Sequence, residues 1–155
     1  MAHMICAIVG PLEDIADVVR LAGNPPANEL ACGLAIIPLG EAQITRLTDG
    51  RPSELVSGFG ELSHGLEEAL AALATRGAFA YIETVYFNGA GGQAAVLFSP
   101  GSAPRRMTEP PASTGPINLA LRSLGVKARP GSDEFDTVGL GPYRNLRRLG
   151  LKNEG

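Results

Sequence analysis

The sequence feature that most constrains the fold is a β-hairpin in the second half of the chain. Two apolar runs, Ala78–Phe87 and Gly92–Ser99, flank the turn sequence Asn88–Gly91. Asn-Gly tolerates the positive φ that tight hairpin turns require, so the pattern predicts two antiparallel strands. The first run is apolar at nearly every position, which is typical of a strand in the middle of a sheet.

Apolar periodicity indicates further strands and helices around this hairpin. Two earlier strands are expected, at Ile5–Val9 and in the buried run Cys32–Leu39. The expected helices are one that opens at Gly10-Pro11, then Glu41–Leu47, Glu61–Arg76 and Pro116–Leu124, and a last one through Tyr143, Leu146 and Leu149. This order predicts an α+β fold. We expect a mixed or antiparallel sheet that contains the C-terminal-half hairpin and is covered by amphipathic helices mainly on one face.

The length of 155 residues is that of one ordinary domain, expected over residues 4–155. Residues 1–3 resemble an expression scar, so His3 is left out of functional reasoning. The segment Ser99–Pro116 holds five prolines and no apolar period, and for a loop of this length we favour disorder. Cys6 and Cys32 lie in apolar runs and are expected to be buried thiols in strands.

No signal peptide and no apolar run of about 20 residues is visible, so we expect a cytoplasmic protein that does not bind membranes. The formal net charge is −3, but it is unevenly spread. Residues 1–99 carry 4 basic and 11 acidic side chains, whereas residues 100–155 carry 9 basic and 5 acidic ones. The acidic part would repel nucleic acid and attract a basic partner. We therefore expect no nucleic-acid binding.

The sequence contains none of the common catalytic motifs. His64 is the one histidine apart from His3, and neither GxSxG nor SxxK occurs. A single histidine cannot build a His-rich zinc site, and the acidic run Asp133–Asp136 lacks the spacing of a calcium loop. We expect no catalytic residue, no metal and no cofactor, and assign the acidic run a capping or turn role.

Glu83 is the most informative polar residue, because a charge in the middle of an apolar strand is costly unless it is paired. It either forms a structural ion pair, with Arg122 or Arg144 as partner, or belongs to a recognition surface on the hairpin. The residues expected to contact a partner or ligand are Glu83, Tyr86, Gln93, Asp133, Glu134, Asp136 and Arg144.

Two blocks of sequence resemble a known group of proteins. They are YIETVYFNGAGGQAAVLF (Tyr81–Phe98) and INLALRSLGV followed by DEFDTVGLG (Ile117–Gly141), together under half of the chain. They resemble small bacterial proteins, mostly of unassigned function, that are encoded beside polymorphic toxins and are regarded as immunity proteins. The resemblance implies stoichiometric binding to a toxin, without catalysis.

Three functional hypotheses follow. The first is a non-enzymatic immunity protein that neutralises a basic toxin domain by direct binding. The alternative is a small enzyme or anionic-ligand-binding domain with a polar pocket around Glu83, in which Glu83 is a general base or Arg122 or Arg144 binds an anion. The third is an oligomeric protein, for example a homodimer, in which the apolar hairpin pairs edge to edge with a second copy.

Overall fold

The computed structural model describes residues 2–87, 90–108, 115–143 and 145–151, without the side chains of residues 2, 3, 86, 87, 90 and 91. Six antiparallel strands form one sheet in the order β2-β3-β1-β4-β5-β6. The strands are β1 (Ala2–Gly10), β2 (Asn28–Glu29), β3 (Ala35–Pro38), β4 (Phe79–Phe87), β5 (Ala90–Phe98) and β6 (Arg105–Thr108). The helices are α1 (Ala16–Leu21), α2 (Glu41–Thr48), α3 (His64–Ala72), α4 (Pro116–Ser123) and α5 (Glu134–Val138). The predicted α+β class and the hairpin are confirmed.

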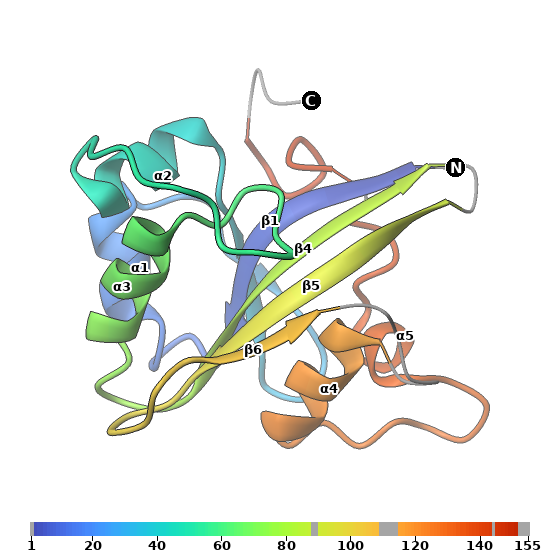
Figure 1. Cartoon of the computed structure of the whole chain (residues 1–155). Helices are drawn as coiled ribbons and strands as arrows, with labels where there is room; N and C mark the ends of the chain where they lie inside the picture. Colours follow the sequence, from blue (N-terminus) through green and yellow to red (C-terminus); the bar gives the residue numbers. More distant parts are fainter. Residues whose placement is uncertain (1, 88–89, 109–114, 144, 152–155) are drawn as a thin grey trace.

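The central pair of the sheet is β1 and β4, as the two-sided apolar pattern of the hairpin predicts. The long register between them runs from Ala2↔Phe87 to Val9↔Ala80. Figure 1 shows these two strands and β5 extending together past the helices toward the end of the chain marked N. The backbone of residues 2 and 3 continues β1.

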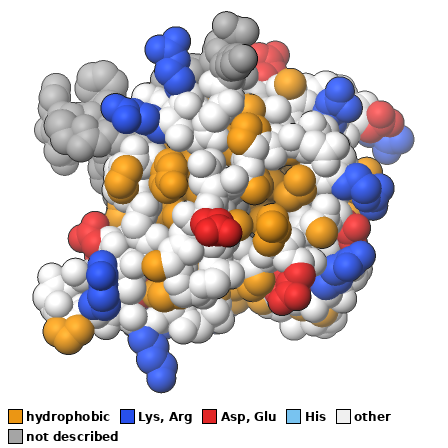
Figure 2. All heavy atoms as spheres, turned by 180° about the vertical axis from the view of Figure 1, so that it is seen from behind, with side chains coloured by type: hydrophobic (Ala, Val, Ile, Leu, Met, Phe, Trp, Pro, Cys, Tyr) orange, Lys and Arg blue, Asp and Glu red, His pale blue; other side chains and the backbone are white. Residues whose placement is uncertain are grey.

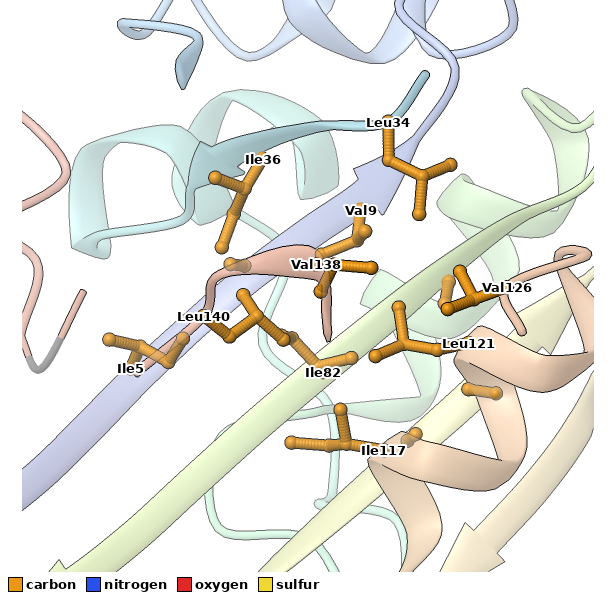
Figure 3. Packing of buried hydrophobic residues seen from close by; sticks show 14 of the residues in the cluster. Ile5, Val9, Leu34, Ile36, Ile82, Ile117, Leu121, Val126, Val138 and Leu140 are labelled. Atoms are coloured by element: carbon orange, nitrogen blue, oxygen red, sulfur yellow. The ribbon is translucent and has the colours of Figure 1, made fainter. Parts of the chain in front are cut away.

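The helices cover both faces of the sheet, which corrects the expectation of cover mainly on one face. On one face, α1, α2 and α3 pack on alternate strand residues such as Ile8, Phe79 and Tyr81. On the other face, α4 and α5 pack on the intervening residues, such as Ala7 and Ile82. Figure 3 shows this second core, where side chains from α4 and α5 meet those of β1, β3 and β4. The central strands are apolar at successive positions because each face needs its own core.

Several predicted boundaries change for local reasons. The first helix begins at Ala16, because residues 11–14 form a turn in which Pro11 O accepts from Asp14 N. α3 begins at His64, because the side chain of Ser63 caps it by accepting from Leu66 N at 3.1 Å. α2 matches its predicted range to within one residue.

Two further expectations were wrong, and the disorder favoured for Ser99–Pro116 is contradicted where the segment forms a strand. Cys32 is exposed in a turn of positive φ before β3, so that only Cys6 is a buried thiol. Within Ser99–Pro116, residues 105–108 form β6, because Met107 points inward between exposed neighbours; residues 109–114 lie outside the described part. Residues 145–150 form consecutive turns ending at Gly150, with φ of 101°, in place of the predicted last helix.

Figure 2 shows the side of the molecule that is turned away in Figure 1. Hydrophobic side chains gather near the middle of that side, and Lys and Arg side chains lie mainly around its outline. Large hydrophobic side chains exposed among the described residues are Met4, Leu12, Leu21, Leu55 and Val85. Of these, Met4 and Val85 are cross-strand neighbours in β1 and β4, each 49% exposed.

The two-sided core gives a direct test with Ile117→Ala in α4. Ile117 is fully buried, so its truncation should lower the free energy of unfolding by about 2–5 kcal/mol. The control is Leu12→Ala, at a side chain that is 53% exposed, with an expected change within about 0.5 kcal/mol. Urea unfolding followed by circular dichroism measures both. Equal, small effects would show that α4 is not packed on the sheet.

Candidate functional site

Glu83 carries a buried carboxylate in the middle of β4, with all its partners inside the chain. Its side chain points to the face covered by α3, and the residue is only 6% exposed. One carboxylate oxygen accepts from Gly60 N at 2.5 Å, and the other from Glu61 N at 3.1 Å and from the Tyr81 hydroxyl at 2.6 Å. Three donors therefore satisfy a charge that would otherwise be costly to bury.

One alternative for Glu83 was an ion pair with Arg122 or Arg144, and this was wrong for Arg122. Arg122 lies on α4, on the opposite face, and pairs with Glu134 at 3.3 Å. Arg144 lies outside the described residues. The donors to Glu83 are mainly backbone N–H groups, which no sequence pattern reveals.

Glu83 thereby anchors residues 56–62, which we call the crossing segment, onto the sheet. Val56, Phe59 and Leu62 of this segment are buried in the same core as Tyr81, and the Phe59 and Tyr81 rings are 6.2 Å apart. Gly58 has a φ of 88°, and a Cβ there would come within 2.8 Å of the Thr108 side chain of β6. The segment thus crosses from β4 toward β6 in close contact with the strands.

A short chain of polar contacts continues from Glu83 into the core. The Tyr81 hydroxyl, which donates to Glu83, also lies 3.0 Å from the Cys6 sulfur of β1. Burial raises the pKa of the Cys6 thiol, and burial followed by the nearby Cys6 and Glu83 raises the pKa of Tyr81 well above its usual 10.0. Both groups are therefore held protonated, so Cys6 is not an activated nucleophile.

Cavities lie on both sides of Glu83. The smaller one has a volume of about 220 Å³ and opens toward β5, where Gly92 and Ala94 line it. The larger one has a volume of about 510 Å³ and opens toward β1 and α2. We call the larger one the acidic cavity. Its lining residues are Met4, Ile5, Cys6, Leu39, Gly40, Glu41, Ile44, Thr45, Gly60, Glu61, Glu83, Thr84, Val85 and Leu146.

The acidic cavity combines an apolar floor with carboxylates. Met4 and Val85 supply exposed apolar surface, and Ile44 of α2 adds to it. Glu41 and Glu61 are exposed, and no salt bridge joins either of them to another described residue. Among the described lining residues there is no Lys, Arg or His. The cavity therefore favours a group that is cationic at one point and apolar at another.

Of the other predicted contact residues whose side chains the structure describes, Gln93 lines the smaller cavity with Glu83, whereas Asp133, Glu134 and Asp136 line neither cavity. Gln93 accepts from Ile117 N at 2.7 Å and so tethers the start of α4, although it also lines the smaller cavity. The side chain of Tyr86 lies outside the described part. Because side chains alternate along a strand, Glu83 points to one face of the sheet and Gln93 points to the other face, where α4 packs. The polar character of these residues alone does not predict this separation.

The acidic run forms the start of α5 on that opposite face. Asp133 caps the helix by accepting from Asp136 N at 2.9 Å, and it also accepts from Asn118 at 3.1 Å. Glu134 pairs with Arg122, and Asp136 is exposed. The expected capping role is confirmed for Asp133. Within the described residues no three His, Cys, Asp or Glu side chains gather to hold a metal ion.

The residues that sequence reasoning missed are the apolar and acidic ones around the larger cavity. Met4 was treated only as a starting residue, and Glu41 only as the first residue of a helix. The one sequence feature that could have pointed to this cavity is Gly40. It lies between a strand and a helix, where the chain turns and a cavity can form.

The anchoring role of Glu83 predicts a large effect of Glu83→Gln. The side-chain NH₂ group of the glutamine would face at least one of the donors that now bond to the carboxylate, and that hydrogen bond would be lost. The free energy of unfolding should therefore fall by about 2–4 kcal/mol. The amides of Gly60 and Glu61 should also exchange faster in hydrogen-exchange measurements. Glu68→Gln, at an exposed acid of α3, is the control. Unchanged exchange at Gly60 and Glu61 in the Glu83 variant would contradict the anchor.

The raised pKa values of Cys6 and Tyr81 predict a loss of stability at high pH. In the unfolded chain the two groups have their ordinary pKa values of 9.0 and 10.0. Their contribution to stability is fully present below those pKa values and is lost as the pH rises toward the higher pKa values of the folded state. The free energy of unfolding should fall by up to about 1.4 kcal/mol per pH unit for each group. Urea unfolding between pH 7 and 11 measures this, and Cys6→Ala should flatten the profile above pH 9. Parallel profiles for the variant and the parent would refute the assignment.

Comparison with known proteins adds no relative to this description. No helix in the described part is long and apolar enough to cross a bilayer. No family model, no curated protein and no solved structure matches the chain.

Proposed function

We propose that this chain is a non-enzymatic binding protein that receives a basic segment of a partner protein in the acidic cavity. The observation that carries the proposal is the composition of the cavity: three glutamates and an apolar floor, with no basic side chain among the described lining residues. Glu83 has its hydrogen bonds inside the chain. Glu41 and Glu61 are therefore the acids available to a partner.

Long-range charge supports the same kind of partner. Residues 1–99, which supply all but one of the described lining residues, carry 4 basic and 11 acidic side chains. Complementary charge of this kind raises the rate of association and selects against acidic partners. It also disfavours the anionic ligand that we considered as an alternative.

Catalysis by Glu83 is the weaker alternative. A general base must reach a proton of the substrate, whereas both oxygens of Glu83 already accept from donors within the chain. Arg122 is paired with Glu134 on the other face and is not placed to bind a substrate beside Glu83. The geometry thus supports binding by the cavity over chemistry within it.

We further propose that the partner is a bacterial toxin domain and that the chain is its immunity protein, acting in the cytoplasm. The support is the resemblance of Tyr81–Phe98 and Ile117–Gly141 to such proteins, together with the acidic cavity. A toxin that cleaves nucleic acid needs a basic surface to bind its substrate, and an acidic inhibitor complements that surface.

The test is co-expression with the protein encoded next to this chain. The parent chain should co-purify with it and protect cells from it. The double variant Glu41→Lys/Glu61→Lys should bind at least tenfold more weakly. The control is Glu13→Lys/Glu68→Lys, which makes the same change of charge at exposed acids outside the cavity and should retain binding.

Two outcomes would overturn the proposal. In the first, the neighbouring protein neither co-purifies nor harms cells, which removes the immunity role. In the second, the two double variants lose binding equally, which shows that net charge and not the cavity attracts the partner.

A further inference from the structure

We infer that the partner's basic segment binds as an added β-strand along the first half of β1, at the outward-facing backbone groups of Met4. This inference rests on the proposed function and specifies how the acidic cavity is used. Addition of an extended peptide to an exposed sheet edge is a common mode of peptide recognition, in which main-chain hydrogen bonds give affinity and side-chain pockets give specificity.

One side of β1 is only half paired. Toward β4, the strand is paired from Ala2 to Val9, whereas toward β3 the register covers Ala7 to Gly10 only. The last hydrogen bond on the β3 side runs from Leu39 N to Cys6 O, at 2.8 Å. Among the described residues, no backbone pairs with this side of residues 2–5.

Local sequence explains why β3 does not continue along β1. The last contact of this segment with β1 is made by Leu39, whose N–H donates to Cys6 O. At the next residue, Gly40 N donates to the Gln43 side chain at 2.9 Å, which starts α2 and turns the chain away from the sheet. The unpaired part of β1 is therefore fixed by how the strand and the helix are joined.

Strand alternation identifies the backbone groups that are available. Successive residues of a strand direct their N–H and C=O groups to opposite sides. Since Cys6 O points toward β3, the N–H and C=O groups of Met4 point the same way. Met4 thus offers one donor and one acceptor to an added strand, beside its exposed side chain.

The acidic cavity lies beside this unpaired edge. It is lined by residues 4–6 of β1, by Leu39 and Gly40 where β3 ends, and by the first turns of α2. A strand added here would direct every second side chain toward the face of Met4 and Val85. Lysine or arginine on that strand would then reach Glu41 or Glu61.

The charges of the cavity decide between two occupants. A second copy of this chain, paired through the same edge, would bring the cavity acids of both copies close together, which is unfavourable. A basic strand from another protein meets complementary charge. We therefore assign the edge to a basic, extended segment and not to a homodimer.

The test uses the full chain and a defined probe, the peptide acetyl-Lys-Val-Lys-Val-Lys-Val-amide. In an NMR titration the peptide should bind and should slow the hydrogen exchange of the Met4 amide. A peptide of the same sequence with every backbone nitrogen methylated, and a peptide with Glu in place of Lys, should each bind at least tenfold more weakly. The Glu41→Lys/Glu61→Lys variant should lose the peptide to a similar extent.

Met4→Pro removes the outward N–H without removing a donor to β4, and proline is tolerated on strand edges. It should weaken binding of the lysine peptide at least tenfold, whereas Met4→Leu should have little effect. Thermal unfolding checks that Met4→Pro folds; if it does not, the methylated peptide decides.

Three results would overturn the inference. They are no binding of the lysine peptide, equal binding of the methylated peptide, or a slowing of Met4 amide exchange that rises with protein concentration in the absence of peptide. The last result would assign the edge to a second copy. Failure here is separable from failure of the proposed function. If Met4→Pro still binds the toxin while Glu41→Lys/Glu61→Lys does not, the cavity binds its partner without strand addition.

Discussion

The arrangement of the chain around the sheet depends on one buried carboxylate whose hydrogen bonds must be made inside the molecule. Glu83 lies in a central strand, where an unpaired charge would oppose folding, and two backbone N–H groups and a phenol satisfy it. Because the two backbone donors belong to residues 60 and 61, the crossing segment must lie across the sheet. Gly60 of this segment lines both cavities, and Glu61 lines the larger one.

The sequence predicted those parts of the fold that local patterns specify. The hairpin, α2 and α4 follow from turn residues and apolar periodicity within short windows. The cover on both faces was not predictable, because amphipathicity does not say which face a helix will cover. β6 was hidden in a proline-rich stretch, since four residues with one inward side chain give too weak a pattern.

The candidate site was predicted in part, for a related reason. Glu83 stands out because its charge conflicts with its apolar neighbours, and conflicts of this kind are visible in a sequence. Its partners are not visible, because a backbone N–H belongs to every residue except proline. The acids at 133–136 attracted attention by their density, yet Asp133 and Glu134 serve α5 and its junction with α4. The cavity residues come from five separate segments, so only the fold brings them together.

The pairing of the first strand with β4 has a consequence for synthesis on the ribosome. Cys6 and Tyr81, which meet across these strands, are 75 residues apart in sequence. β1 therefore leaves the ribosome long before its central neighbour exists, and contacts so distant in sequence are slow to form. During that interval only the elements that precede β4, namely α1, β2, β3, α2 and α3, are present to shield its apolar residues from water. Kinetic vulnerability in this protein is thus concentrated in the unfinished chain, before the hairpin has been made.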